Sequence, residues 1–163
     1  MSAYSPEDWS DFLVASSGAS AALAGLVFIG ISINLTRILD GPGLPGRAGQ
    51  TIVILANALA VSLAVLGPQH SHVGVGAEIL LIGLAGWLAV NWIQVRAPVD
   101  PAHRGNRRRA WLLLQFATVP FLVAGVSTMV EAGGGLYWMQ AGVILSLLVG
   151  LGNSWVLLIE ILR

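Results

Sequence analysis

Apolar residues in this chain gather into five long runs that are separated by short polar gaps. The runs cover residues 11–38, 48–67, 73–95, 110–130 and 136–161. Each run has at least about 20 residues, the length that a helix needs to cross the hydrocarbon core of a bilayer. Backbone polar groups in lipid must be satisfied within such a segment, so we expect helices. The pattern predicts an all-α polytopic membrane protein, with five transmembrane helices in a single domain over residues 1–163.

Helix start and stop signals refine these boundaries. Ser5 and Pro6, followed by two acidic residues, form a helix-start signal. A helix from Pro6 to Leu39 has about 34 residues and a length of about 50 Å, more than the hydrocarbon core requires. Pro45 is expected to open the second helix, and Pro120 to remove one backbone hydrogen bond within the fourth. The first helix is therefore predicted to be long and either tilted or projecting from the membrane.

Every basic residue of the chain is an arginine, and the arginines fall in alternate gaps between the runs. Their positions are Arg37, Arg47, Arg96, Arg104, Arg107, Arg108, Arg109 and Arg163. The second and fourth gaps and the first ten residues contain neither arginine nor lysine. Cytoplasmic loops of membrane proteins carry such an excess of positive charge. The distribution predicts an N-terminus outside the cell and a C-terminus in the cytoplasm.

Composition narrows the class of protein further. Hydrophobic residues make up 56% and charged residues 10% of the chain, which excludes an ordinary soluble surface. The absence of cysteine excludes disulfide, thiol and iron–sulfur chemistry, and the sequence has no hydrolase, metalloprotease or nucleotide-binding motif. We therefore expect a protein that is not an enzyme and takes no cofactor or metal. The run Arg107–Arg109 is assigned to lipid headgroups, so nucleic acid is not an expected partner.

Two segments of the chain resemble other proteins. Residues Gly18–Arg37 and the ending Gly152–Arg163 are similar to small uncharacterised multi-span membrane proteins of bacteria. The absence of lysine alongside many alanine, glycine and arginine residues is also typical of GC-rich bacterial genomes. The resemblance implies a multi-pass protein of the bacterial inner membrane and does not imply an activity.

Small residues recur at three- or four-residue spacing in three of the predicted helices. Such ridges allow helices to pack closely in lipid, where the hydrophobic effect does not drive association. The ridges are Gly18, Ala22 and Gly25 in the first helix, Gly83, Gly86 and Ala89 in the third, and Gly142, Ser146 and Gly150 in the fifth. They predict that these three helices approach one another or a second copy of the chain. The ridge of the fifth helix or that of the first is the predicted seam of a homo-oligomer.

Polar side chains also occur within the apolar runs, where they are costly unless they face protein or water. The candidates for a polar stripe or pore lining are Asn57, Gln50, Ser146, Asn153, Gln115 and Asn34. Two interpretations remain open from the sequence. The side chains either hydrogen-bond between helices and hold them together, or they line a hydrated path through one copy or along an oligomer axis.

Two groups of ionisable residues are further candidates. The outer group is Glu78, His70, His72 and Glu131. Because histidine titrates near neutrality, this group is a candidate cluster for sensing protons or cations. Its spacing is not specific for a metal ion, and the alternative is that the histidines are ordinary loop residues. At the inner side, Arg37 and Glu160 are predicted to form an ion pair.

Permeation is the function that these features favour. Five helices are few with which to enclose a pore, so we expect several copies to form a channel-like path for ions or small solutes. The polar stripes of the second and fifth helices would line the path, and the outer ionisable group would modulate entry. The alternative is a non-transporting accessory subunit that packs against another membrane complex through its small-residue ridges.

Overall fold

The computed structural model describes residues 3–68, 71–97 and 104–162, with the side chains of 104–107 and 156–162 excepted. Helix accounts for 88% of the structure, and no strand occurs in the described residues. A short 3-10 helix, η1 (Pro6–Trp9), is followed by α1 (Ser10–Ile33), α2 (Leu35–Asp40), α3 (Leu44–Leu66), α4 (His72–Arg96), α5 (Arg104–Met129) and α6 (Leu136–Leu162). Within them, α1, α3, α4, α5 and α6 provide five segments that are long and apolar enough to cross a membrane. The predicted all-α fold with five long apolar helices is confirmed.

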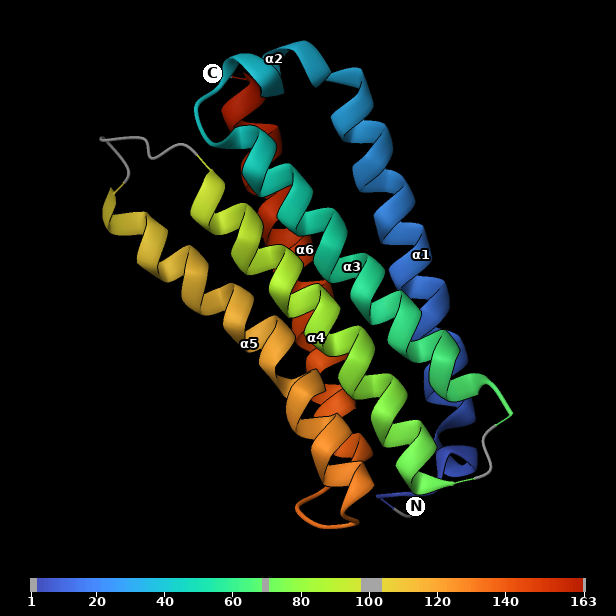
Figure 1. Ribbon diagram of the computed structural model, residues 1–163. Coiled ribbons are helices and arrows are strands. Elements are labelled where there is room, and N and C mark those ends of the chain that lie inside the picture. Colours follow the sequence, from blue (N-terminus) through green and yellow to red (C-terminus); the bar gives the residue numbers. More distant parts are fainter. Residues whose placement is uncertain (1–2, 69–70, 98–103, 163) are drawn as a thin grey trace.

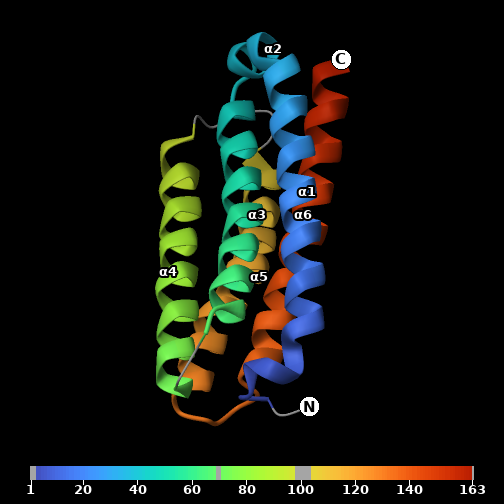
Figure 2. The same cartoon turned by 90° about the vertical axis from the view of Figure 1, so that its right-hand side faces the viewer.

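The five long helices lie side by side and alternate in direction along the chain (Figure 1, Figure 2). α3 packs against α1, α4 and α6, and α5 packs against α4 and α6. α1 is peripheral, because 17% of the apolar stretch in its span is buried, against 50% for α3. The two termini lie at opposite ends of the bundle (Figure 1), as an odd number of spans requires.

The first helix differs from the sequence prediction. It is not continuous from Pro6 to Leu39, because α1 ends at Ile33 and α2 begins at Leu35. Asn34 lies between them with φ −109° and ψ 18°, outside the helical range. Its side-chain amide donates a hydrogen bond to the carbonyl of Gly30 over 3.0 Å. Such a local bond offers the backbone an alternative to continued helix, so the first span is shorter than predicted and α2 is a separate short helix.

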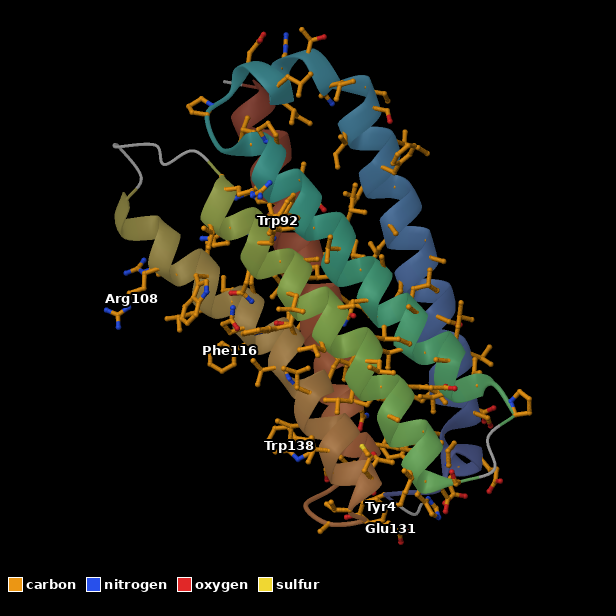
Figure 3. All side chains as sticks on the ribbon, in the orientation of Figure 1. Tyr4, Trp92, Arg108, Phe116, Glu131 and Trp138 are labelled. Atoms are coloured by element: carbon orange, nitrogen blue, oxygen red, sulfur yellow. The ribbon has the colours of Figure 1, made fainter. Side chains whose placement is uncertain are left out.

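Charged residues separate to the two ends of the bundle. We call the end that carries Arg37, Arg47, Arg96, Arg108 and Arg109 the arginine end, and the end that carries Glu7, Asp8, Asp11 and Glu131 the acidic end. Figure 3 shows Arg108 toward the first and Glu131 at the second. At the arginine end the guanidinium of Arg96 lies 4.1 Å from the centroid of the Trp92 ring. The structure therefore keeps the charge separation that the sequence contains.

The small-residue ridges pair differently from the prediction. α4 packs against α3 and α5, whereas α1 packs mainly against α3 and less against α6. The prediction that the first, third and fifth long helices all approach one another is therefore wrong for the third, α4. The reason is that its glycines receive larger neighbours: Gly83 faces Phe121 of α5, and Gly86 faces Asn57 of α3.

Candidate functional site

The predicted polar stripe is used for contacts between helices. The amide nitrogen of Gln50 donates to Gln94 Oε1 over 2.7 Å and thereby joins α3 to α4. Ser146 of α6 donates to the carbonyl of Ala117 in α5 over 3.1 Å. These side chains act as the hydrogen-bonded contacts between helices that the sequence left open as one of two interpretations.

Gln115 belongs to a small network between α4 and α5. Its side-chain oxygen accepts from Trp87 Nε1 over 2.7 Å, and its amide nitrogen donates to Asn91 Oδ1 over 3.2 Å. Trp111 Nε1 also donates to Asn91 Oδ1, over 3.2 Å. Sequence reasoning missed Trp87 as a member. The four-residue spacing of Trp87 and Asn91, which places both on one face of a helix, was the available signal.

The remaining members of the stripe lie apart. Asn57 is 5% exposed and packs on Gly86, and its amide nitrogen has no hydrogen-bond partner among the described residues. Asn153 is half-buried on α6. Asn34 lies at the break between α1 and α2, at the arginine end. The stripe is therefore distributed over several helix contacts, and a common path along it stays a prediction.

The outer ionisable group is also distributed in the structure. His72 Nδ1 lies 2.8 Å from the backbone carbonyl of Tyr4, so its ring holds the N-terminal segment. Glu131 is exposed in the turn before α6, with a positive φ of 52°, and Glu78 is half-buried in the second turn of α4. His70 lies outside the described residues. No set of three metal-ligating side chains occurs in the described part of the chain, and a sensing role for the group stays a prediction.

The N-terminal segment closes over the acidic end of the bundle. The backbone N–H of Leu136 donates to the carbonyl of Ala3 over 2.8 Å, and that of Gly134 donates to the hydroxyl of Tyr4 over 3.2 Å. Trp9 is 3% exposed and packs edge-on against Tyr137, with ring centroids 4.9 Å apart. These contacts attach the start of the chain to α6. No sequence pattern predicts these contacts, since they join residues far apart in the chain.

The predicted inner ion pair lies partly outside the described side chains. Arg37 is exposed on α2 at the arginine end. The side chain of Glu160 is outside the described part of α6. The pairing of Arg37 with Glu160 therefore stays a prediction.

A groove opens at the arginine end between α1, α2, α3 and α6, and we call it the inner groove. Its volume is about 290 Å³. Its apolar lining includes Leu23, Val27, Ile31, Leu55 and Leu151. Asn34 and Ser154 supply polar side chains, and Gly30 contributes backbone without a side chain. Asn34, at the break between α1 and α2, and Ile38 of α2 line the groove at its arginine end.

The outer surface of α1 is the second candidate site, which we call the α1 face. Asp11, Gly18, Gly25 and Ser32 follow one another at seven-residue spacing, and all four are exposed. A Cβ atom added to Gly18 or Gly25 would meet nothing within 4 Å. Figure 2 shows α1 on the near side of the bundle, beside α6. The small residues of this face are open to whatever surrounds the bundle.

The ridge of α6, by contrast, is filled within the chain. A Cβ atom on Gly142 would lie 3.1 Å from the Phe121 ring, and one on Gly150 would lie 2.8 Å from Leu55. Ser146, between them, is fully buried. Residues of α5 and α3 therefore occupy this ridge, which favours the ridge of α1 as the predicted seam between copies.

Comparisons of the chain with protein-family models, with curated proteins and with solved structures returned no match. The two candidate sites are accordingly interpreted from their own residues.

Proposed function

We propose that this chain is a non-enzymatic, multi-pass protein of the bacterial inner membrane that works as a homo-oligomer joined through the α1 face. The five long apolar helices fit such a membrane protein. The gathering of arginines at one end favours placing that end in the cytoplasm, with the N-terminus outside. The alternation of the helices and the opposite positions of the two termini agree with this orientation.

One observation carries the proposed assembly: the glycines of the α1 face turn outward, whereas the predicted small-residue ridge of α6 turns inward. A lipid tail gains little from contact with glycine, because there is no side chain to touch. A second helix gains more, because small residues let two backbones approach closely. The seven-residue spacing of Gly18 and Gly25 suits the shallow crossing of two long helices.

The experiment measures the mass of the assembly in detergent and in nanodiscs. We expect the unmodified chain to form a defined oligomer and Gly25→Leu to weaken it, because the leucine separates the two backbones. Gly152→Leu is the matched control, since a Cβ atom there also meets nothing within 4 Å but lies on α6. A monomeric unmodified chain, or equal loss from both variants, would contradict the proposal.

The absence of cysteine allows a second measurement. Ala22→Cys, on the α1 face, is expected to form disulfide-linked dimers on mild oxidation in membranes. Leu84→Cys, which is exposed on α4, is the matched control and is expected to remain monomeric. A purified chain that is monomeric but links through Ala22→Cys to a different membrane protein would favour the accessory-subunit alternative.

Channel-like permeation between copies is the second candidate function. The observation that favours it is the position of Asp11 at the acidic end of the α1 face and of Ser32 toward the other end, in line with the two glycines. A path along this line would carry a carboxylate at one mouth, which favours cations. Purified protein in planar bilayers is expected to conduct cations, and Asp11→Asn to reduce the cation preference. Absence of conductance from a verified oligomer would reject this candidate and leave the assembly standing.

A further inference from the structure

We propose that the inner groove holds one acyl chain of an anionic phospholipid from the leaflet at the arginine end. The inference rests on the membrane embedding proposed above and does not depend on the oligomer. A groove of about 290 Å³ lies near the lower end of the sizes found for small-molecule sites. It is partly open, since Leu26, Gly30 and Leu151 of its lining are exposed.

The length of the groove matches one leaflet of a bilayer. Along α1 its lining runs from Leu23 to Asn34, and the eleven steps between these residues rise about 16 Å. Half of the hydrocarbon core is about 15 Å. Leu55 of α3 and Leu151 of α6 complete an almost wholly hydrocarbon lining. A straight acyl chain from the nearer leaflet has the chemistry and the reach to lie in it.

The polar groups of the groove lie at the end where a headgroup would be. An amide nitrogen carries two N–H groups, and the bond from Asn34 to the Gly30 carbonyl uses one of them. Beyond Asn34, α2 and the first turn of α3 carry Arg37 and Arg47 against the single carboxylate of Asp40. This rim has a net positive charge, which favours a phospholipid with a negative headgroup over a zwitterionic one.

Gly30 leaves room for the chain in the middle of the groove. It lines the groove, and a Cβ atom added there would meet nothing within 4 Å. The Cβ atom of a leucine at this position would therefore meet no neighbour, and the rest of its side chain would extend into the space proposed for lipid. This geometry provides a direct way to close the site.

The experiment counts phospholipids that remain bound to the purified protein. The chain is delipidated in detergent, re-exposed to phosphatidylglycerol or phosphatidylcholine, and examined by native mass spectrometry. We expect one phosphatidylglycerol per chain and weaker retention of phosphatidylcholine. Gly30→Leu is expected to weaken retention about tenfold or more, because loss of two methylene contacts already has that effect. Gly152→Leu, equally open but outside the groove lining, is expected to retain the lipid.

If Gly30→Leu does not fold, a second measurement tests the proposal on the unmodified protein. A phosphatidylglycerol with a diazirine in its acyl chain is expected to crosslink the unmodified protein at residues 23–34 and 151–154. Retention of lipid by folded Gly30→Leu, or crosslinks spread evenly over the helices, would overturn the proposal. A change in assembly mass with Gly30→Leu and no loss of lipid would also overturn it, by showing that a second copy covers the groove. Failure of the embedding itself would appear separately, as unmodified protein that does not fractionate with membranes.

Discussion

The α4–α5 contact and the outer surface of α1 are built from the same small residues and serve opposite purposes. A Cβ atom on Gly125 of α5 would lie 2.6 Å from the Cβ atom of Leu80 in α4. A Cβ atom on Gly18 or Gly25 of α1 would meet nothing within 4 Å. In the first region glycine lets two backbones of one chain approach closely. In the second it leaves a surface that no part of the described chain covers.

This difference shows what glycine spacing in a membrane helix can and cannot indicate. Close approach of helices selects small residues whether the partner belongs to the same chain or to another. Spacing therefore identifies a packing face and leaves its occupant open. In this chain the occupant is internal for α4 and α6, and the α1 face is the one available to a second copy.

The largest expected effect is a difference in stability between a variant at the α4–α5 contact and a variant on the α1 face. Gly125→Ala is expected to lower the free energy of unfolding by about 1–3 kcal/mol, because the added methyl group collides with Leu80. Gly18→Ala is expected to leave it unchanged or to raise it by roughly 0.5–1 kcal/mol, because alanine favours helix and space is open. Unfolding by sodium dodecyl sulfate, followed by circular dichroism, measures both. Equal changes in the two variants would remove the contrast between the regions.

Most of the fold followed from the sequence, because long apolar runs leave helix as the available structure in lipid. The break at Asn34 did not follow. It depends on a side-chain bond to Gly30 that competes with the helix, and on the packing of Ile38, which is 2% exposed, at the other side of the break. A tertiary contact of this kind leaves no periodic pattern in the sequence. The inner groove was not predictable either, because its lining joins residues of α1, α3 and α6 that are far apart in the chain.

Polar side chains also differ between the bundle interior and α1. In the bundle interior, Gln50 of α3 bonds to Gln94 of α4. On α1, the hydroxyl of Ser17 donates to the carbonyl of Val14 in its own helix over 2.9 Å. Both arrangements satisfy the polar group, but only the first connects two helices.

A double-mutant cycle on Gln50→Leu and Gln94→Leu is expected to give the second-largest effect. The coupling energy should be about 0.6 kcal/mol and no more than about 1.7 kcal/mol, the range found for hydrogen bonds between helices in membranes. Ser17→Ala, as the α1 counterpart, should change the free energy of unfolding by less than about 0.5 kcal/mol. Additive effects of the two glutamine substitutions would show that this bond does not hold α3 to α4.

The candidate site was predictable only in part, and for a physical reason. The sequence identified Gln50, Asn57, Gln115 and Ser146 as polar positions within spans, and the structure accounts for three of them by bonds between helices. The choice between such bonds and a water path depends on which helices are neighbours. Which helices are neighbours depends in turn on how side chains of different volume fit together over the whole bundle. The packing of Phe121 against Gly83 is one example.

The most local expected effect concerns how the N-terminal segment is attached at the acidic end. His72→Phe keeps a ring but removes the 2.8 Å bond to the Tyr4 carbonyl. One hydrogen bond contributes about 0.5–1.5 kcal/mol, so amide hydrogen exchange at residues 3–13 and at Leu136 should become roughly 2- to 10-fold faster. Ser71→Ala is the matched control, since it removes the cap on the Gly74 N–H at the start of the same helix and leaves Tyr4 untouched. If both variants accelerated exchange equally, the start of α4 rather than the His72 bond would hold the segment.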